Sequence, residues 1–178
     1  MSERASAKFG RRLAKYRKLA GLSARELSEA LGGEMSRGVI ANIESGRKTD
    51  ITIDQLIALA WALDVPPVVL ALPVDEPYRA VRTVSSPHEQ VAVRAWALAK
   101  WFEGKHEPGG IGSPDPTPAG AFTREMMSAI AEYFRMENGA ARSPEGTEDR
   151  RVRELELRGQ AHTLKQLKVD MTPHSMAD

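Results

Sequence analysis

The sequence predicts an all-α protein: five short helices at the N-terminus, then a linker and a helical C-terminal region. Three observations favour this class. Apolar residues before position 73 recur at the three- and four-residue spacing of amphipathic helices. Capping residues and glycines separate these stretches into short segments. One stretch, Tyr78 to Val84, has the character of a strand, and no partner strand is evident beside it.

The first two helices are defined by their apolar faces and their ends. Gly21 ends the first, and Ser23 with Glu26 forms a capping box that starts the second. Gly32 and Gly33 then break the second helix. The inner face of the first consists of Phe9, Leu13, Tyr16 and Ala20. That of the second consists of Leu27, Ala30 and Leu31.

Three more helices follow at short intervals. Ser36 caps the third, which ends at Gly46, and Thr52 with Gln55 forms the capping box of the fourth. Pro66-Pro67 suit the first turn of a short fifth helix that runs through Leu72. The apolar face of the third helix is Val39, Ile40 and Ile43, and that of the fourth is Ile53, Leu56, Ile57, Leu59, Ala60 and Leu63.

The chain beyond residue 72 divides by composition. Residues 73–87 are predicted to be a linker, 88–103 a helix, and 104–121 a disordered loop rich in glycine and proline. Residues 122–171 are predicted to form a helical C-terminal region, with helices from Thr123 to Asn138, stopped by Gly139, and from Glu148 to Met171. Residues 172–178 are predicted to be a flexible tail.

The composition excludes several classes of protein. The absence of cysteine excludes disulfides, cysteine-zinc sites and thiol catalysis. The longest apolar run, Val65 to Val74, is ten residues long, whereas a membrane span needs about 20. Met1 to Gly21 lack the apolar core of a signal peptide. We therefore expect a soluble, cytoplasmic protein without membrane contact.

The formal net charge of +1 conceals a basic N-terminus. Between Met1 and Arg25 stand eight basic residues and one acid, which gives this segment a net charge of +7. A basic end on a near-neutral chain favours a polyanionic partner such as DNA. A solvated helix face explains the same charges equally well.

The second and third helices together have the pattern of a helix-turn-helix. Two short helices are joined by a glycine-containing turn, and the second begins with exposed polar residues. A helix enters a major groove about 12 Å wide only when its outer face is small and polar. That outer face consists of Arg37, Gly38, Ala41 and Asn42.

These residues belong to a longer pattern that covers residues 8–72. Its positions are Phe9-Gly10, Arg12-Leu13, Arg17, Gly21-Leu22-Ser23, Glu26-Leu27, Leu31-Gly32, Ser36, Ile40, Ile43-Glu44, Gly46-Arg47, Leu56, Leu59-Ala60, Leu63 and Val65. The pattern resembles the Cro/phage-repressor (XRE-type) helix-turn-helix family. The overall style, an N-terminal reader on a chain rich in alanine and arginine, resembles immunity repressors of temperate phages of actinobacteria.

The resemblance implies roles for individual residues. Contacts to base edges are expected from Arg37, Gly38 and Asn42. Contacts to phosphates are expected from Ser23, Arg25, Ser36, Ser45, Arg47 and Lys48. Arg17 and Glu44 are expected to form a structural ion pair between two helices. The implied partner is double-stranded operator DNA.

The sequence departs from the family pattern in two places. Ala24 stands where family members often have a glutamine that braces the recognition helix and binds phosphate. The turn between the second and third helices is about two residues longer than usual in this family, and Gly33-Glu34 is the expected insertion. This insertion bears on the register of Arg37.

No residue pattern indicates an enzyme, a metal site, a cofactor or a small-molecule ligand. His88-Glu89 begins a zinc-protease motif but lacks the second histidine four residues on. Ala119-Gly120 and Ser175-Met176 resemble fragments of a self-cleaving peptidase, but no lysine follows the serine.

Two apolar features indicate interfaces. Trp61 occupies a position that the family usually gives to an exposed polar residue. Leu157, Leu164 and Met171 recur every seven residues in the last predicted helix. Either the 123–138 helix of the same chain or the equivalent helix of a second chain is expected to cover this stripe. Self-association would pair two readers on a two-fold site, so we expect a homodimer joined through the C-terminal helices.

The function that the resemblance implies is repression of transcription at operator sites, as in phage immunity and lysogeny. Two alternatives remain open: an autoregulating antitoxin whose C-terminal helices bind a toxin, and a helical adaptor that docks protein instead of DNA.

Overall fold

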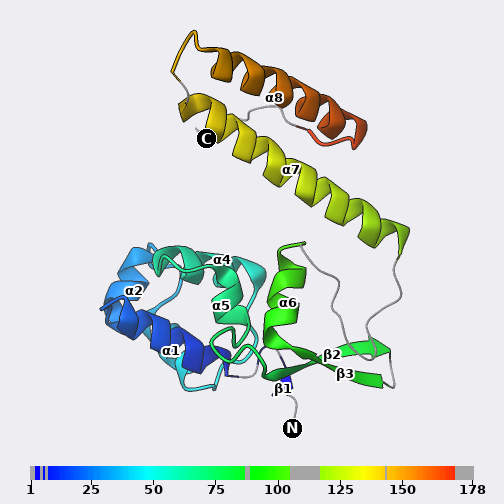
Figure 1. Ribbon diagram of the computed structural model, residues 1–178. Coiled ribbons are helices and arrows are strands. Elements are labelled where there is room, and N and C mark those ends of the chain that lie inside the picture. The colour runs from blue at the N-terminus through cyan, green and yellow to red at the C-terminus, as the bar shows by residue number, and fades with distance from the viewer. Residues whose placement is uncertain are drawn as a thin grey trace. The chain divides into compact units, whose positions relative to one another are not determined.

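The computed structural model describes residues 3–4, 6, 8–86, 89–104, 117–142 and 144–170. The chain divides into two compact units, Met1–Pro114 and Asp115–Asp178. Figure 1 shows that both are mostly helical, as the sequence predicts. Within the described residues, no helix combines the length and the apolar character that crossing a membrane requires.

The first unit begins with the five predicted helices. Their bounds are α1 Phe9–Leu19, α2 Ala24–Ala30, α3 Arg37–Glu44, α4 Ile53–Ala62 and α5 Pro67–Ala71. The predicted caps are present: the hydroxyl oxygens of Ser23, Ser36 and Thr52 each accept a hydrogen bond from the backbone N–H three residues on. These caps satisfy donors that the first turn of a helix leaves without partners, so each helix start is set locally.

One apolar core joins the five helices. Its buried side chains include Phe9, Leu13, Leu27, Ile40, Ile43, Leu59, Leu63 and Leu70. Met35, in the turn between α2 and α3, is also buried in this core. Met35 directly precedes the cap residue Ser36, and Ile40 is the fourth residue of the helix, which is the spacing of a hydrophobic staple. That spacing is a second signal in the sequence, beside the Ser36 cap, for the start of α3.

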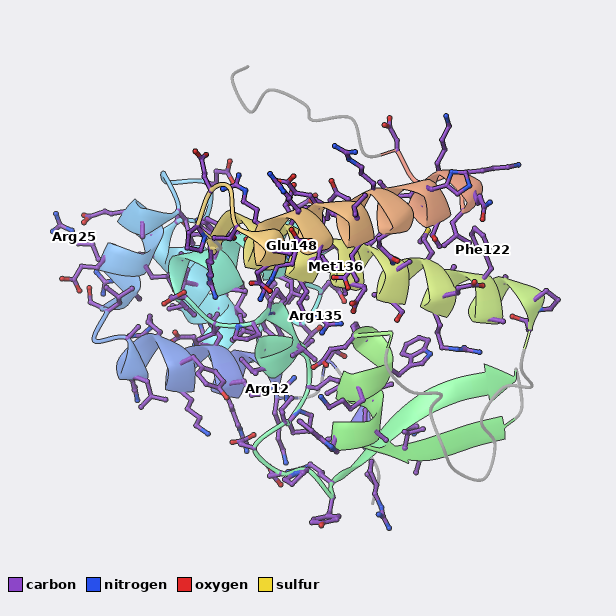
Figure 2. All side chains as sticks on the ribbon, turned by 45° about the horizontal axis from the view of Figure 1, so that its top comes forward. Arg12, Arg25, Phe122, Arg135, Met136 and Glu148 are labelled. Carbon is purple, nitrogen blue, oxygen red and sulfur yellow. The ribbon has the colours of Figure 1, made fainter. Side chains whose placement is uncertain are left out.

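Arg12 is a buried charged residue that links α1 to α5. Its Nε donates to the carbonyl oxygen of Leu70 at 2.7 Å, and its Nη2 donates to that of Ala71 at 2.8 Å. These carbonyls lie at the C-terminus of α5, where a cation is favoured by the helix dipole. Figure 2 shows Arg12 between the two helices.

The predictions for residues 73–87 and 88–103 are correct only in part. Strands occupy residues 80–86 of the predicted linker and residues 89–94 of the predicted helix, and helix is found only over residues 95–102. Strand β2, Ala80–Ser86, pairs antiparallel with β3, Glu89–Arg94, and β1, Glu3–Arg4, pairs parallel with β2. The partner of β2 therefore lies in the segment for which the sequence predicts a helix. In that segment Val91 and Ala95 fit helical spacing, whereas Val91 and Val93 fit the two-residue period of a strand.

Helix α6, Ala95–Phe102, follows β3 directly and completes a second core. This core consists of Leu72, Val81, Val93, Ala95, Leu98 and Ala99. Val68 and Ala71 of α5 pack against it, while Leu70 of the same helix belongs to the first core. Helix α5 therefore joins the five-helix domain to the sheet.

The second unit is a pair of antiparallel helices, α7 (Pro118–Arg142) and α8 (Glu148–Gln166). Helix α7 begins before the predicted start at Thr123, within the predicted loop 104–121, and it continues through Gly139. A Cβ at Gly139 would lie 3.0 Å from Nη1 of Arg153, so α8 crosses closely at this position. Helix α8 ends before the predicted end at Met171.

The apolar stripe of α8 is covered within the chain. Leu164 is fully buried, Leu157 is half-buried, and Nε2 of Gln160 donates to the carbonyl oxygen of Ala129 at 3.0 Å. Leu164 is therefore a core residue of the helix pair, and its expected place at an interface between chains is wrong. Met171, the tail 172–178 and most of the loop 104–121 lie outside the described residues.

Candidate nucleic-acid interface

Helix α3 separates an apolar inner face from a polar outer face. Ile40 and Ile43 are buried against the core, and α3 packs on both α1 and α2. The opposite side is therefore exposed along the whole helix. The residues on this exposed side are Arg37, Gly38, Ala41 and Asn42. The structure thus brings the three predicted base-reading residues together on one accessible surface.

Gly38 is not required by the fold. A Cβ at this position would meet only Oγ of Ser36, at 3.8 Å, which is ordinary van der Waals contact. Glycine costs a helix up to about 1 kcal/mol relative to alanine. A glycine at this position leaves the backbone of α3 bare on the exposed face.

The predicted phosphate-binding residues flank this face. Ser23 and Arg25 lie at the start of α2, and Ser45, Arg47 and Lys48 follow the end of α3. Nε of Arg25 donates to Oε1 of Glu29 at 2.8 Å, with side chains 79% and 61% exposed. Such an exposed pair contributes little, so Arg25 can exchange Glu29 for a phosphate at low cost. Figure 2 shows Arg25 pointing away from α2.

The serine hydroxyls near α3 differ in whether the O–H group already donates a hydrogen bond within the protein. Ser23 and Ser36 accept hydrogen bonds as helix caps, so each O–H is available to a phosphate oxygen. The hydroxyl of Ser45 instead donates to the carbonyl oxygen of Asn42 at 3.2 Å. Ser45 must give up this bond to donate to DNA, which makes it the weakest candidate of the three.

A bidentate ion pair holds α3 in place. Nε and Nη2 of Arg17 donate to the two carboxylate oxygens of Glu44 at 2.6 and 2.8 Å, and Nη1 donates to the carbonyl oxygen of Leu22 at 2.7 Å. The Arg17 and Glu44 side chains are 12% and 16% exposed. The hydrogen bond to Glu44 raises the pKa of Arg17 above its ordinary value. Arg17 therefore ties the end of α3 to α1 and to the residue before Ser23.

The turn between α2 and α3 contains two left-handed glycines. Gly32 and Gly33 have φ of 63° and 82°. Glu34 is exposed, and the buried Met35 then anchors the turn before α3 begins. Ala24 is half-buried against the core. Ala24 therefore contributes packing.

The remaining sequence candidates belong to other segments of the chain. Trp61 is 87% exposed on α4. Within the described ranges, no group of three histidine, aspartate or glutamate residues could hold a metal ion. His88, Ser175 and Met176 fall outside those ranges.

Comparison with known families locates a match on this domain. The model of the helix-turn-helix family matches residues 13–70, which run from α1 to α5 and include the whole exposed face of α3. No curated protein and no solved structure matches the chain. The N-terminal part of this protein is therefore a helix-turn-helix domain of the Cro/repressor type, a family of DNA-binding transcription regulators.

Proposed function

We propose that this protein is a sequence-specific repressor that binds operator DNA through α3. One observation carries the proposal: the exposed face of α3 is small and polar, it begins with Arg37, and Arg47 and Lys48 follow directly after the helix. A face of this kind fits a major groove about 12 Å wide. Occupation of an operator by such a domain blocks transcription from an overlapping promoter.

Three residues on the α3 face have distinct roles in this proposal. Arg37 donates two hydrogen bonds to O6 and N7 of guanine, a contact worth about 1–3 kcal/mol of discrimination. Asn42 pairs with an adenine edge or with a phosphate. Gly38 lets the helix backbone lie close to the bases, because it has no side chain to hold them apart. Arg47, Lys48 and Arg25 neutralise phosphates and set the register.

The experiment that tests this proposal compares one arginine variant and one lysine variant, each on operator DNA and on random DNA. Arg37→Ala should weaken operator binding by about 1–3 kcal/mol and leave binding to random DNA nearly unchanged. Lys48→Ala should weaken both kinds of binding about equally and reduce the salt dependence. Lys165→Ala in α8 removes a charge from the second unit and serves as the control. Equal losses on both DNAs for Arg37→Ala would make it a phosphate contact.

We further propose that the operator belongs to a temperate phage and that repression confers immunity. The overall style of the chain, an N-terminal reader on a chain rich in alanine and arginine, supports this role. Footprinting on the DNA that flanks its own gene should reveal the operator, and cells that express the protein should resist a phage carrying that operator. Co-purification of a second, toxic chain would instead favour an antitoxin.

A further inference from the structure

Helix α4 carries a stripe of large apolar side chains that face solvent. Ile53, Ile57 and Trp61 are four residues apart, so they lie on one face of the helix. They are 74%, 52% and 87% exposed, respectively. The five-helix core is complete without them, since Leu59 and Ala60 supply the buried side of α4. Contiguous exposed apolar residues of this size are typical of a surface that another molecule covers.

Trp61 stands between two shallow hollows. The first, of about 390 Å³, lies between the end of α2 and α4, and its apolar lining includes Leu31 and Ile57. The second, of about 490 Å³, lies where α4 turns into α5, and its lining includes Val65 and Pro66. A partner that covers Trp61 therefore has an apolar recess for a side chain on each side of the indole ring.

All charged residues that line the two hollows are acidic. Glu34 and Asp54 border the first, and Asp64 borders the second. All three are exposed. The surrounding sequence has the same bias, because Thr49 to Tyr78 contains no lysine, arginine or histidine. This surface is therefore apolar at its centre and negative at its edge.

The charge pattern selects among possible occupants. DNA is disfavoured, because the carboxylates would face phosphates. A second copy of the same surface is also disfavoured, since it would bring Glu34, Asp54 and Asp64 of both chains together with no cation between them. A helix with an apolar face flanked by lysines or arginines complements both the apolar centre and the negative edge of this surface.

We propose that the α4 surface, defined by Ile53, Ile57 and Trp61 and bordered by Glu34, Asp54 and Asp64, docks a basic amphipathic helix of a partner protein. Apolar residues of that helix cover Trp61 and enter the hollows beside it. Its basic residues pair with the three carboxylates. The α4 surface is separate from the exposed face of α3, so the proposal does not depend on DNA reading.

A synthetic peptide tests this proposal on the full-length protein. The probe is an amphipathic helix with leucines along one face and lysines along both flanks, and its twin has glutamate in place of every lysine. The lysine peptide should bind, and the glutamate twin should not. Trp61→Ala should weaken binding about tenfold or more, because a central tryptophan is a typical binding hot spot. Trp101→Ala on α6, where the side chain is 46% exposed, is the matched control and should have no effect.

Charge-neutral variants test the carboxylates without disturbing the apolar stripe. Glu34→Gln and Asp64→Asn should each weaken peptide binding severalfold and reduce its dependence on salt. Asn suits position 64 because the backbone there is left-handed, with φ of 52°. Two results would overturn the proposal: unchanged peptide affinity in Trp61→Ala, or equal affinity for the glutamate twin. Self-association of the wild type that Trp61→Ala abolishes would also overturn it, by showing a second copy on this surface.

Discussion

Two helical glycines in the first unit are present for opposite reasons. A Cβ at Gly10 in α1 would lie 2.0 Å from the carbonyl oxygen of Ile43, so the approach of α1 to the end of α3 requires glycine. A Cβ at Gly38 in α3 would meet only Oγ of Ser36 at 3.8 Å. The first glycine serves the fold, and the second has room for a side chain that the fold would tolerate.

Gly10→Ala is expected to destabilise the protein by about 3 kcal/mol, because the added methyl group forces two backbones apart. Denaturant unfolding monitored by circular dichroism measures this loss. Gly159→Ala in α8 is the matched control: a Cβ there meets nothing within 4 Å, so this variant should be stabilised by about 0.5–1 kcal/mol. Equal stability of Gly10→Ala and the wild type would contradict the packing of α1 on α3.

Gly38→Ala is expected to increase stability and to weaken operator binding. The variant should unfold at slightly higher denaturant concentration, with a gain of up to about 1 kcal/mol, because alanine is the better helix former. Operator affinity should fall about tenfold, because the methyl group stands between the backbone of α3 and the base edges. Fluorescence anisotropy with labelled operator DNA measures the second effect. Unchanged affinity would show that the backbone at Gly38 does not approach the DNA.

Arg17→Met is expected to cost about 3 kcal/mol, because it leaves the mostly buried carboxylate of Glu44 without its partner. The double variant Arg17→Met with Glu44→Leu should recover much of this loss, since it removes the unpaired charge. Arg25→Ala breaks an exposed pair and should change stability by less than about 0.5 kcal/mol. A loss in Arg17→Met as small as that of Arg25→Ala would argue against the ion pair.

At the scale of elements, a second ion pair joins α1 to the segment after α5. Nζ of Lys15 lies 2.5 Å from Oδ2 of Asp75. The hydrogen bond from Lys15 is the main cause that lowers the pKa of Asp75 below its ordinary value. A carboxylate with a lowered folded-state pKa stabilises the fold above its unfolded pKa of about 3.9. This contribution is lost as the pH falls through the folded-state pKa.

Asp75→Asn is therefore expected to reduce stability slightly near neutral pH and to have a smaller effect at acidic pH. At low pH the wild-type carboxyl is protonated as well, so the two proteins converge. Denaturant midpoints measured from about pH 7 down to about pH 3 test this convergence. Asp50→Asn, at an exposed aspartate just before α4, is the control and is measured over the same range. A constant difference between Asp75→Asn and the wild type would exclude the pair as its cause.

For the molecule as a whole, self-association remains a prediction. The structure indicates a different contact surface for it than the stripe with Leu164. The stripe with Leu164 is buried within the α7–α8 pair, whereas Val152 and Leu155 on α8 are 45% and 65% exposed. We expect a homodimer through this outer side of the second unit. Leu155→Arg should produce a monomer in sedimentation experiments, and Leu19→Arg, at an exposed leucine of α1, should not. A wild-type monomer that protects an asymmetric DNA site would contradict the dimer.

Features that depend on neighbours along the chain could be predicted from the sequence. The helix starts at Ser23, Ser36 and Thr52 follow from hydrogen bonds that span three residues, so their signals are visible in the sequence. The exposed face of α3 follows in the same way, because Ile40 and Ile43 assign the inner side and leave the outer side to Arg37 and Asn42.

Features that depend on distant partners could be established only from the folded structure. Residues 89–94 became a strand because residues 80–86 pair with them, and Val91 alone fits either periodicity. Leu164 became a core residue because α7 folds back on α8, one of two covers that its stripe allowed. Gly10 acquired its role from a carbonyl more than thirty positions away, at Ile43. Local hydrogen bonds and periodicity carry no information about which distant surface closes over a residue, and that surface decides burial and pairing.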